Sequence, residues 1–269
     1  MEPRKREEPG VSNPRSQDHG GPGSAGATAR PAQAAARTQH QAVLTVREAS
    51  GPTLGVALVL HGGRSRSYAP VAALHLSPAR MVPFARHLHR AGKGHGLAVW
   101  SLRNSVRGWN GEDMTPLRDA RWALKQISAR HPGVPVYLLG HSMGGLTAVC
   151  AADDPQVDAV VALAPWLSAQ APASRVAGRR VLIVHGTGDH LTSPSESLKF
   201  ARRAAEDAAS MQYVSLRGAG HFMVRRVRLW HVLATGFVMK VFSERTGADL
   251  PAARALDELL PVSALHVTL

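Results

Sequence analysis

The chain has 269 residues, 44% of them hydrophobic, and a formal net charge of +13 at pH 7. This size and composition allow one substantial core, so we expect a single folded domain with terminal extensions. A lone cysteine, Cys150, excludes an intramolecular disulfide, and the longest apolar runs fall well short of the roughly 18 residues of a membrane-spanning helix. The positive charge is spread out and matches no nucleic-acid-binding module, so we expect no specific nucleic-acid partner.

The first 40 residues contain almost no large apolar side chain. Such a segment buries too little surface to offset the entropy of ordering it, so residues 1–40 are predicted to be a disordered N-terminal extension. Their charges are not followed by the apolar segment of a secretory signal, which predicts a cytoplasmic location.

Residues 41–245 are predicted to form a catalytic domain built on a parallel sheet. Apolar, β-branched runs are typical of strands, and continuous runs indicate strands that are covered on both faces. These runs lie at residues 56–60, 97–101, 136–139, 157–163, 181–184 and 212–216.

Helical patterns separate and follow these runs. They cover residues 81–90, 116–130, 146–152, 195–209 and 224–242, and residues 246–269 are expected to form a C-terminal helix, at 250–260, and a tail. Strands alternating with helices predict an α/β fold: a doubly wound, mostly parallel central sheet flanked by helices on both faces.

The stretch LLGHSMGG, residues 138–145, places Ser142 between glycines directly after a predicted strand. The pattern G-x-S-x-G alone is weak, but a strand, tight turn and helix around it form the context of a nucleophile elbow. The N-terminus of the following helix would offer amide groups and positive potential to an oxyanion. A free serine is a poor nucleophile, so a base and an orienting acid are also needed.

Two later loops supply these groups. In an open α/β sheet the active site lies outside the carboxyl ends of the strands. His221 follows the run at 212–216 through RGAG, and Asp189 follows the run at 181–184 through HGTG. The order Ser142, Asp189, His221 is one of the known orders of a catalytic triad, with the histidine as base and the aspartate as acid.

Other histidines and acids are alternatives. His61 and His185 directly follow predicted strands and are expected to support loops, and His190 is too near Asp189 to be oriented by it. Glu196, in the next predicted helix, is the alternative acid.

An oxyanion hole needs at least two aimed N–H donors. The sequence LHGGR at residues 60–64 follows the first predicted strand, and we expect the amide of Gly63 to be one donor. The amide of Met143, next to the nucleophile, is expected to be the other.

Four motifs together, LVLHGG, LLGHSMGG, VLIVHGTGDHLTSP and GAGHF, resemble those of the α/β-hydrolase superfamily over about residues 42–243. The elbow and acid loop are similar to those of its dienelactone-hydrolase-like, serine-aminopeptidase-like and monoacylglycerol-lipase-like branches. The resemblance implies the α/β-hydrolase fold and the roles given above to Ser142, Asp189, His221, Gly63 and Met143. It also implies that residues 103–111, RNSVRGWNG, support the site without reacting.

The chain departs from many relatives in one respect. Only residues 166–180 lie between two predicted strands where those enzymes insert a helical lid, so no large lid domain fits. We expect an open site, partly covered by residues 64–80 and by Trp166, a candidate substrate-binding residue. An open site favours small or projecting acyl groups.

The predicted function is a serine hydrolase that cleaves carboxylic esters, or thioesters, through an acyl-enzyme. A small-molecule ester is the expected substrate, with no metal and no cofactor. An acyltransferase, a lyase or a perhydrolase using the same triad is an alternative, as is a basic binding protein without catalysis. The sequence makes no prediction of oligomeric state.

Overall fold

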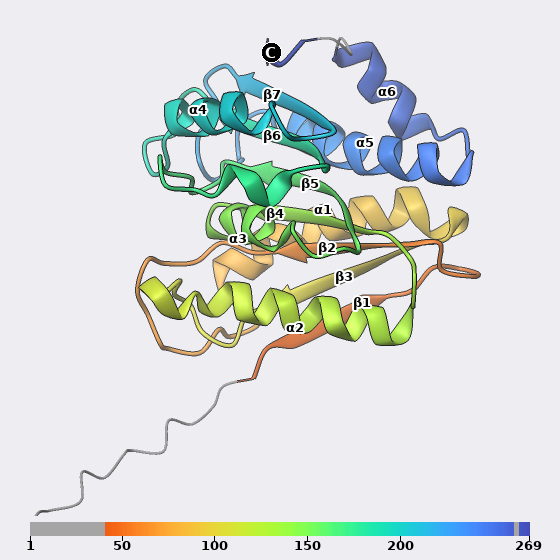
Figure 1. Ribbon diagram of the computed structural model, residues 1–269, viewed down its shortest axis with the longest axis horizontal. Helices are drawn as coiled ribbons and strands as arrows, with labels where there is room; N and C mark the ends of the chain where they lie inside the picture. The colour runs from red at the N-terminus through yellow and green to blue at the C-terminus, as the bar shows by residue number, and fades with distance from the viewer. Residues whose placement is uncertain (1–40, 261–263) are drawn as a thin grey trace, which may run out of the picture. The chain divides into compact units, whose positions relative to one another are not determined.

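Eight strands form one sheet in the computed structural model, which describes residues 41–260 and 264–269 (Figure 1). The predicted extension over residues 1–40 lies outside the described residues. The strand order is β1-β3-β2-β4-β5-β6-β7-β8. Their bounds are β1 Val43–Arg47, β2 Gly55–Leu60, β3 Leu97–Arg103, β4 Val136–His141, β5 Val157–Leu163, β6 Arg180–Gly186, β7 Ser210–Leu216 and β8 His266–Thr268.

The sheet is parallel except at one edge, where β1 runs antiparallel to β3. The six apolar runs coincide with β2 to β7, and β2, β4 and β5 are buried along their whole length. The prediction of a mostly parallel sheet is confirmed. The edge strands β1 and β8 were not predicted, because β1 is partly exposed and β8 has three residues.

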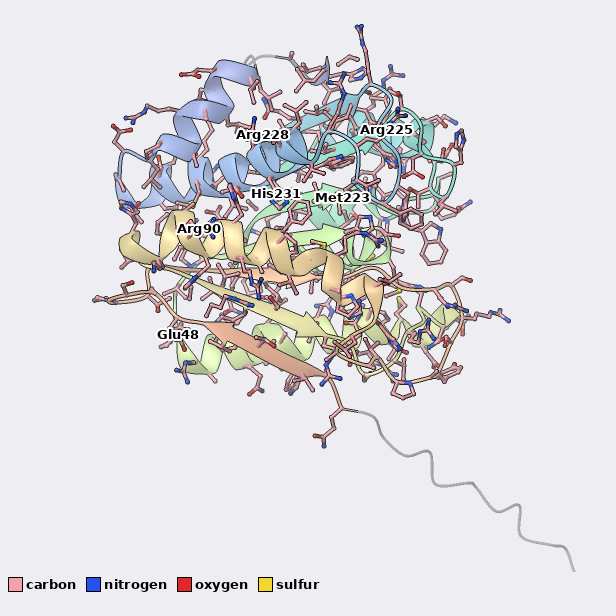
Figure 2. The ribbon with its side chains drawn as sticks, turned by 180° about the vertical axis from the view of Figure 1, so that it is seen from behind. Glu48, Arg90, Met223, Arg225, Arg228 and His231 are labelled. Carbon is pink, nitrogen blue, oxygen red and sulfur yellow. The ribbon has the colours of Figure 1, made fainter. Side chains whose placement is uncertain are left out.

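Helices cover both faces of the sheet. One apolar core lies between the sheet and α1, α5 and α6, and a second lies between the sheet and α2, α3 and α4 (Figures 1 and 2). The doubly wound arrangement is therefore confirmed. The helices are α1 Leu76–Gly92, α2 Thr115–Arg130, α3 Met143–Ala151, α4 Pro194–Ala204, α5 Val227–Thr246 and α6 Pro251–Leu259.

The predicted helices differ from the structure mainly at their ends: α1 begins at Leu76 rather than at residue 81, and α5 covers Val227–Thr246 rather than 224–242. The helix expected over residues 195–209 ends at Ala204, and the turn that follows is tied back by a bond from the Gly178 amide to the Asp207 carbonyl, 2.8 Å. The segment expected to be a C-terminal helix and tail contains α6, whose Leu256 is buried, and also β8, which pairs with β7. Strand pairing across the sheet, rather than local sequence, gives the tail its structure.

The connection between β5 and β6 contains one short 3₁₀ helix, Ala173–Val176. The connection is too short for a lid domain, as predicted from the 15 residues, 166–180, between the two expected strands. Among the described residues, no helix combines the length and the apolar composition needed to cross a membrane.

Candidate active site

Ser142 stands at the turn between β4 and α3 in a backbone conformation that side chains rarely adopt, with φ 57° and ψ −119°. The turn brings backbone groups too close for side chains at the flanking positions. A Cβ on Gly140 would lie 2.1 Å from the carbonyl oxygen of Gly144, and one on Gly144 would lie 2.4 Å from that of Leu60. The glycines of the motif are therefore required by close packing of the backbone.

Hydrogen bonds fix the backbone of Ser142. Its carbonyl oxygen accepts from the amides of Gly145, 2.9 Å, and Trp166, 3.0 Å, and its own amide donates to Leu163, 3.0 Å. Ser142 is half-buried at the N-terminus of α3.

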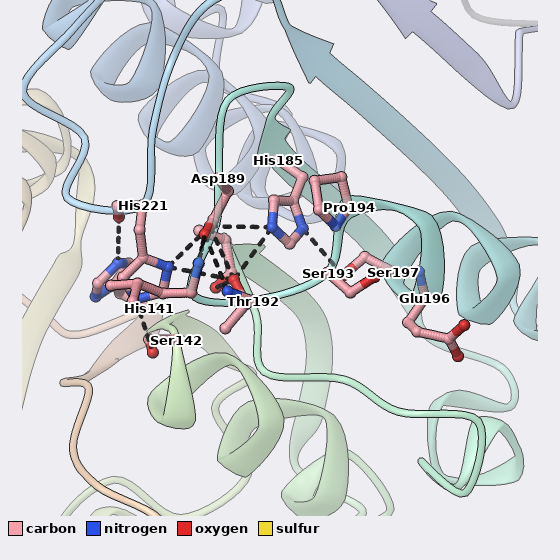
Figure 3. A network of polar contacts seen from close by, with 12 residues as sticks. His141, Ser142, His185, Asp189, Thr192, Ser193, Pro194, Glu196, Ser197 and His221 are labelled. Carbon is pink, nitrogen blue, oxygen red and sulfur yellow. Dashed lines mark hydrogen bonds and ion pairs between the residues drawn. The ribbon is translucent and has the colours of Figure 1, made fainter.

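His221 connects Ser142 to Asp189 (Figure 3). Its Nε2 lies 3.0 Å from Ser142 Oγ, and its Nδ1 lies 2.8 Å from Asp189 Oδ2. The Asp189 side chain is fully buried, and that of His221 is nearly so. The three residues predicted from separate loops are thus brought into one continuous hydrogen-bonded chain.

Asp189 accepts several further hydrogen bonds. The amides of Leu191 and Thr192 donate to Oδ1 at 2.8 and 2.9 Å, and the Thr192 hydroxyl donates to Oδ2 at 2.8 Å. Burial alone would raise the pKa of Asp189, but hydrogen bonds from His185, His221 and these amides outweigh it and hold the pKa well below its usual value. The carboxylate is therefore charged at neutral pH.

His185 and Glu196, two of the alternative residues, have partners other than Ser142. His185 is fully buried, and its Nε2 donates to Asp189 Oδ2 at 3.1 Å; burial lowers its pKa. His190 is exposed, and Glu196 pairs with Lys199 at 2.8 Å. None of these three side chains bonds to the serine.

Residues 61–64, called the oxyanion loop here for the role predicted for Gly63, pack directly against the turn at Ser142. A Cβ on Gly62 would lie 3.2 Å from the Cβ of Ser142, and one on Gly63 would lie 2.3 Å from the Cε of Met143. Neither the Gly63 amide nor the Met143 amide donates to another atom of the described chain. Gly62 thus packs on Ser142 and Gly63 on Met143, and the roles of the Gly63 and Met143 amides as oxyanion donors stay predictions.

His61 braces this loop. Its Nδ1 donates to the Gly62 carbonyl at 2.6 Å, and its Nε2 accepts from the Asn104 amide at 3.1 Å. Burial lowers the pKa of His61 to about 4, so the ring is neutral and both nitrogens are used. This arrangement agrees with the expected role of His61 in supporting a loop.

Residues 103–111 bind the other side of the oxyanion loop. The Arg64 amide donates to the Arg107 carbonyl at 2.8 Å, and the Trp109 amide donates to the Arg64 carbonyl at 2.9 Å. The two loops are therefore joined by backbone hydrogen bonds. This contact is consistent with the supporting role predicted for residues 103–111.

The sequence analysis did not identify Thr192 or His141 as site residues. The Thr192 hydroxyl contacts Asp189, and His141 Nε2 donates to the His221 carbonyl at 2.9 Å. Burial, and then the nearby His221, lower the pKa of His141 to about 3. The position of His141 immediately before Ser142, at the end of a strand, was the available signal.

A cavity of about 410 Å³ adjoins the oxyanion loop. Trp166 is not part of its lining, so substrate binding by Trp166 stays a prediction. Within the described residues, no group of three or more His, Cys, Asp or Glu side chains is placed to hold a metal ion. The cavity lining is His61, Gly62, Gly63, Arg64, Val71, Leu74, His75, Leu76, Ser77, Pro78, Arg80, Arg107 and Phe222.

Comparison with known proteins gives a partial family match. Residues 92–180 match the family described as serine aminopeptidase, S33. No curated protein matches the sequence.

Solved structures resemble this chain at low sequence identity. A putative α/β hydrolase of unknown function from Agrobacterium tumefaciens is 15% identical, with a TM-score of 0.59 over 77% of this chain and 93% of that one. Est1E from Butyrivibrio proteoclasticus with ferulic acid bound is 14% identical, with a TM-score of 0.57 over 75% and 96%. The esterase Est2 from the planctomycete Thermogutta terrifontis with propionate bound is 17% identical, with a TM-score of 0.56 over 76% and 89%.

At these identities the likeness is one of fold. The parallel sheet, the turn between β4 and α3 at Ser142, and the loops that follow β2, β6 and β7 have the arrangement that the four sequence motifs predicted. The chain has the α/β-hydrolase fold.

Proposed function

We propose that this protein is a serine hydrolase that cleaves small carboxylic esters, including thioesters, through an acyl-enzyme. The observation that carries the proposal is the continuous chain from Ser142 Oγ through His221 to Asp189, with separations of 3.0 and 2.8 Å. A nucleophile within reach of a base, itself oriented by a buried acid, is the arrangement that activates a serine hydroxyl.

In the proposed mechanism, Ser142 Oγ attacks the ester carbonyl while His221 Nε2 accepts its proton. Asp189 stays ionised, holds the imidazole in position and stabilises its protonated form. The amides of Gly63 and Met143 would stabilise the oxyanion of the tetrahedral intermediate. His221 then gives the proton to the leaving oxygen, and a water molecule activated by the same imidazole releases the acid.

Two of the similar structures contain a carboxylic acid, ferulic acid in Est1E and propionate in the Thermogutta esterase. A carboxylic acid is one product of ester hydrolysis, which supports the choice of a carboxylic ester for this chain. The short connection between β5 and β6 also favours a substrate that reaches the serine without a lid.

The partial family match raises peptide cleavage as a second candidate, because that family is described as a serine aminopeptidase. An aminopeptidase must bind the positively charged N-terminus of its substrate, for which a carboxylate is the natural partner. The cavity beside the serine is lined by Arg64, Arg80 and Arg107 and by no Asp or Glu. This charge disfavours an ammonium group, so we retain the ester.

Acyl transfer, lyase and perhydrolase chemistry use the same triad and differ in the acceptor or the bond broken. Product analysis with competing alcohols distinguishes transfer from hydrolysis. A binding protein without catalysis would turn over no ester. The cytoplasmic location and the independence from a cofactor stay predictions from the sequence.

The test of the proposal is turnover of 4-nitrophenyl acetate and butyrate by the purified protein. Replacing the nucleophile in a serine hydrolase costs about 10⁶-fold in kcat, so Ser142→Ala should be inactive. Ser50→Ala changes an exposed serine that precedes β2, and it should retain full activity. Wild-type activity in Ser142→Ala would contradict the proposal.

A further inference from the structure

The cavity of about 410 Å³ adjoins the proposed nucleophile through two of its lining residues. Gly62 packs on Ser142, with a Cβ position 3.2 Å from that of the serine, and Phe222 directly follows His221. Sites for small molecules begin at about 300 Å³, so this cavity can hold part of a substrate whose ester group lies at the serine.

Arginine supplies the charge of this cavity. Arg64 comes from the loop after β2, Arg107 from the loop after β3 and Arg80 from α1, and no carboxylate is among the lining residues. Three separate segments of the chain thus bring positive charge to one place beside the oxyanion loop.

These three guanidinium groups have no acidic partner in the described part of the chain. Among the residues that the structure describes, other arginines form ion pairs, such as Arg180 and Arg245 with Asp158, but Arg64, Arg80 and Arg107 form none. Arg64 is exposed to solvent, whereas Arg80 and Arg107 are half-buried. A partly desolvated cation gains free energy when a ligand supplies the opposite charge.

Arg80 packs on an aromatic ring. Its guanidinium lies 4.8 Å from the centre of the Phe222 ring, so the aromatic face holds it at the cavity wall. Burial lowers the pKa of Arg80, as is typical of a cation that has lost water without gaining an anion. The group nevertheless stays charged, because arginine does not lose its proton in proteins.

We propose that the substrate is an ester carrying a second, negatively charged oxygen group, a carboxylate or a phosphate, which Arg80, Arg64 and Arg107 bind. This inference rests on the proposed ester hydrolysis and names its substrate class. The planar, multi-donor guanidinium suits both groups, since it can donate two parallel hydrogen bonds to their oxygens. Anchoring the anion in the cavity would position the ester carbonyl at Ser142.

The test compares kcat/KM for charged and neutral esters of matched shape. A carboxylate on the leaving group is tested with 4-acetoxybenzoate, a phosphate with 4-acetoxyphenyl phosphate, and the neutral reference for both is methyl 4-acetoxybenzoate. A carboxylate on the acyl group is tested with phenyl hydrogen adipate against phenyl hexanoate. At 0.15 M salt the Debye length is about 8 Å, so remote surface charge contributes little.

We expect kcat/KM for at least one charged ester to exceed that for its neutral partner by about tenfold or more. This is the effect of one charge-assisted hydrogen bond. The ester that does so identifies the group and its side of the substrate. Arg80→Gln and Arg107→Gln should each lower this charged-to-neutral ratio about tenfold. The ratio is independent of how much of each variant is correctly folded.

Arg202→Gln is the matched control, since it removes an exposed charge from α4, on the other face of the sheet from α1. It should leave both rates unchanged. The inference is overturned if every charged ester is hydrolysed no faster than its neutral partner, or if the ratio survives in both Arg80→Gln and Arg107→Gln. In that case neutral esters are still hydrolysed, whereas failure of the proposed function itself abolishes turnover of every ester.

Discussion

The imidazole rings of His141 and His221 lie 4.9 Å apart, and His141 Nε2 donates to the His221 carbonyl at 2.9 Å. His141, which precedes the proposed nucleophile Ser142, thus holds the loop that carries the proposed base, His221. His141 Nδ1 is buried, has no hydrogen-bond partner among the described residues and carries no proton, since Nε2 uses the single proton of the neutral ring. This contact depends on the neutral form of a deeply buried histidine.

Acid should therefore destabilise the fold. Below pH 6.5 the unfolded chain binds a proton at His141 that the folded protein does not bind until its pKa of about 3. The free energy of unfolding falls through this window, by about 2 kcal/mol between pH 7 and pH 5 for each such histidine. His61, with a pKa of about 4, adds a similar loss.

Urea denaturation at pH 7 and pH 5 measures this effect. His141→Gln removes one titrating group, so its loss between the two pH values should be smaller than that of the wild type by about 2 kcal/mol, whatever its stability at pH 7. His95→Gln changes an exposed histidine and should keep the wild-type dependence. If the free energy of unfolding falls equally in His141→Gln and the wild type between pH 7 and pH 5, His141 is not a source of the acid sensitivity.

Asp189→Asn tests the acid. An asparagine keeps the shape but cannot stabilise a protonated His221, and the loss in kcat should be about 10⁴-fold. Burst and steady-state rates with 4-nitrophenyl butyrate measure it. A loss of less than about tenfold would remove Asp189 from the triad.

Thr192 is a positioning residue for Asp189. Thr192→Val keeps the shape but loses the hydroxyl that donates to Asp189 Oδ2 at 2.8 Å, so kcat should fall about fivefold, the value of one ordinary hydrogen bond. Thr192→Ser restores the hydroxyl and should recover most of the activity. If serine rescues no better than valine, the hydroxyl has no such role.

Gly140→Ala tests the packing of the elbow. Its Cβ would lie 2.1 Å from the Gly144 carbonyl oxygen, which cannot move without displacing α3, so stability should fall by at least about 1–3 kcal/mol. Gly51→Ala places a Cβ in open space, and its change should stay within about 0.5 kcal/mol. The midpoints of urea denaturation measure the stability of the two variants. An unchanged midpoint in Gly140→Ala would show that the backbone of the turn at Ser142 can move to accommodate the added Cβ.

The sequence was sufficient for the centre of the fold because each of β2 to β7 contains several apolar residues that are buried in the sheet. It was insufficient at the edges. In β1, Val43 and Val46 are exposed, so the burial that defines a central strand is missing. In β8, three residues become a strand only by pairing with β7.

The candidate site likewise contains residues that could be predicted from the sequence and residues that could not. Ser142, Asp189 and His221 each follow a central strand, which local sequence reveals, so their meeting could be predicted. Arg80 and Arg107 come from a helix and a loop that meet only in the folded chain. Their shared cavity therefore has no local sequence pattern.

Labelling with a fluorophosphonate, followed by intact mass and peptide mapping, tests the central claim most directly. A serine activated by His221 should react covalently, with the adduct on the peptide that contains Ser142 and no adduct in Ser142→Ala. Folded wild-type protein that takes up no label, or carries it on a different residue, would contradict the assignment of Ser142 as the nucleophile.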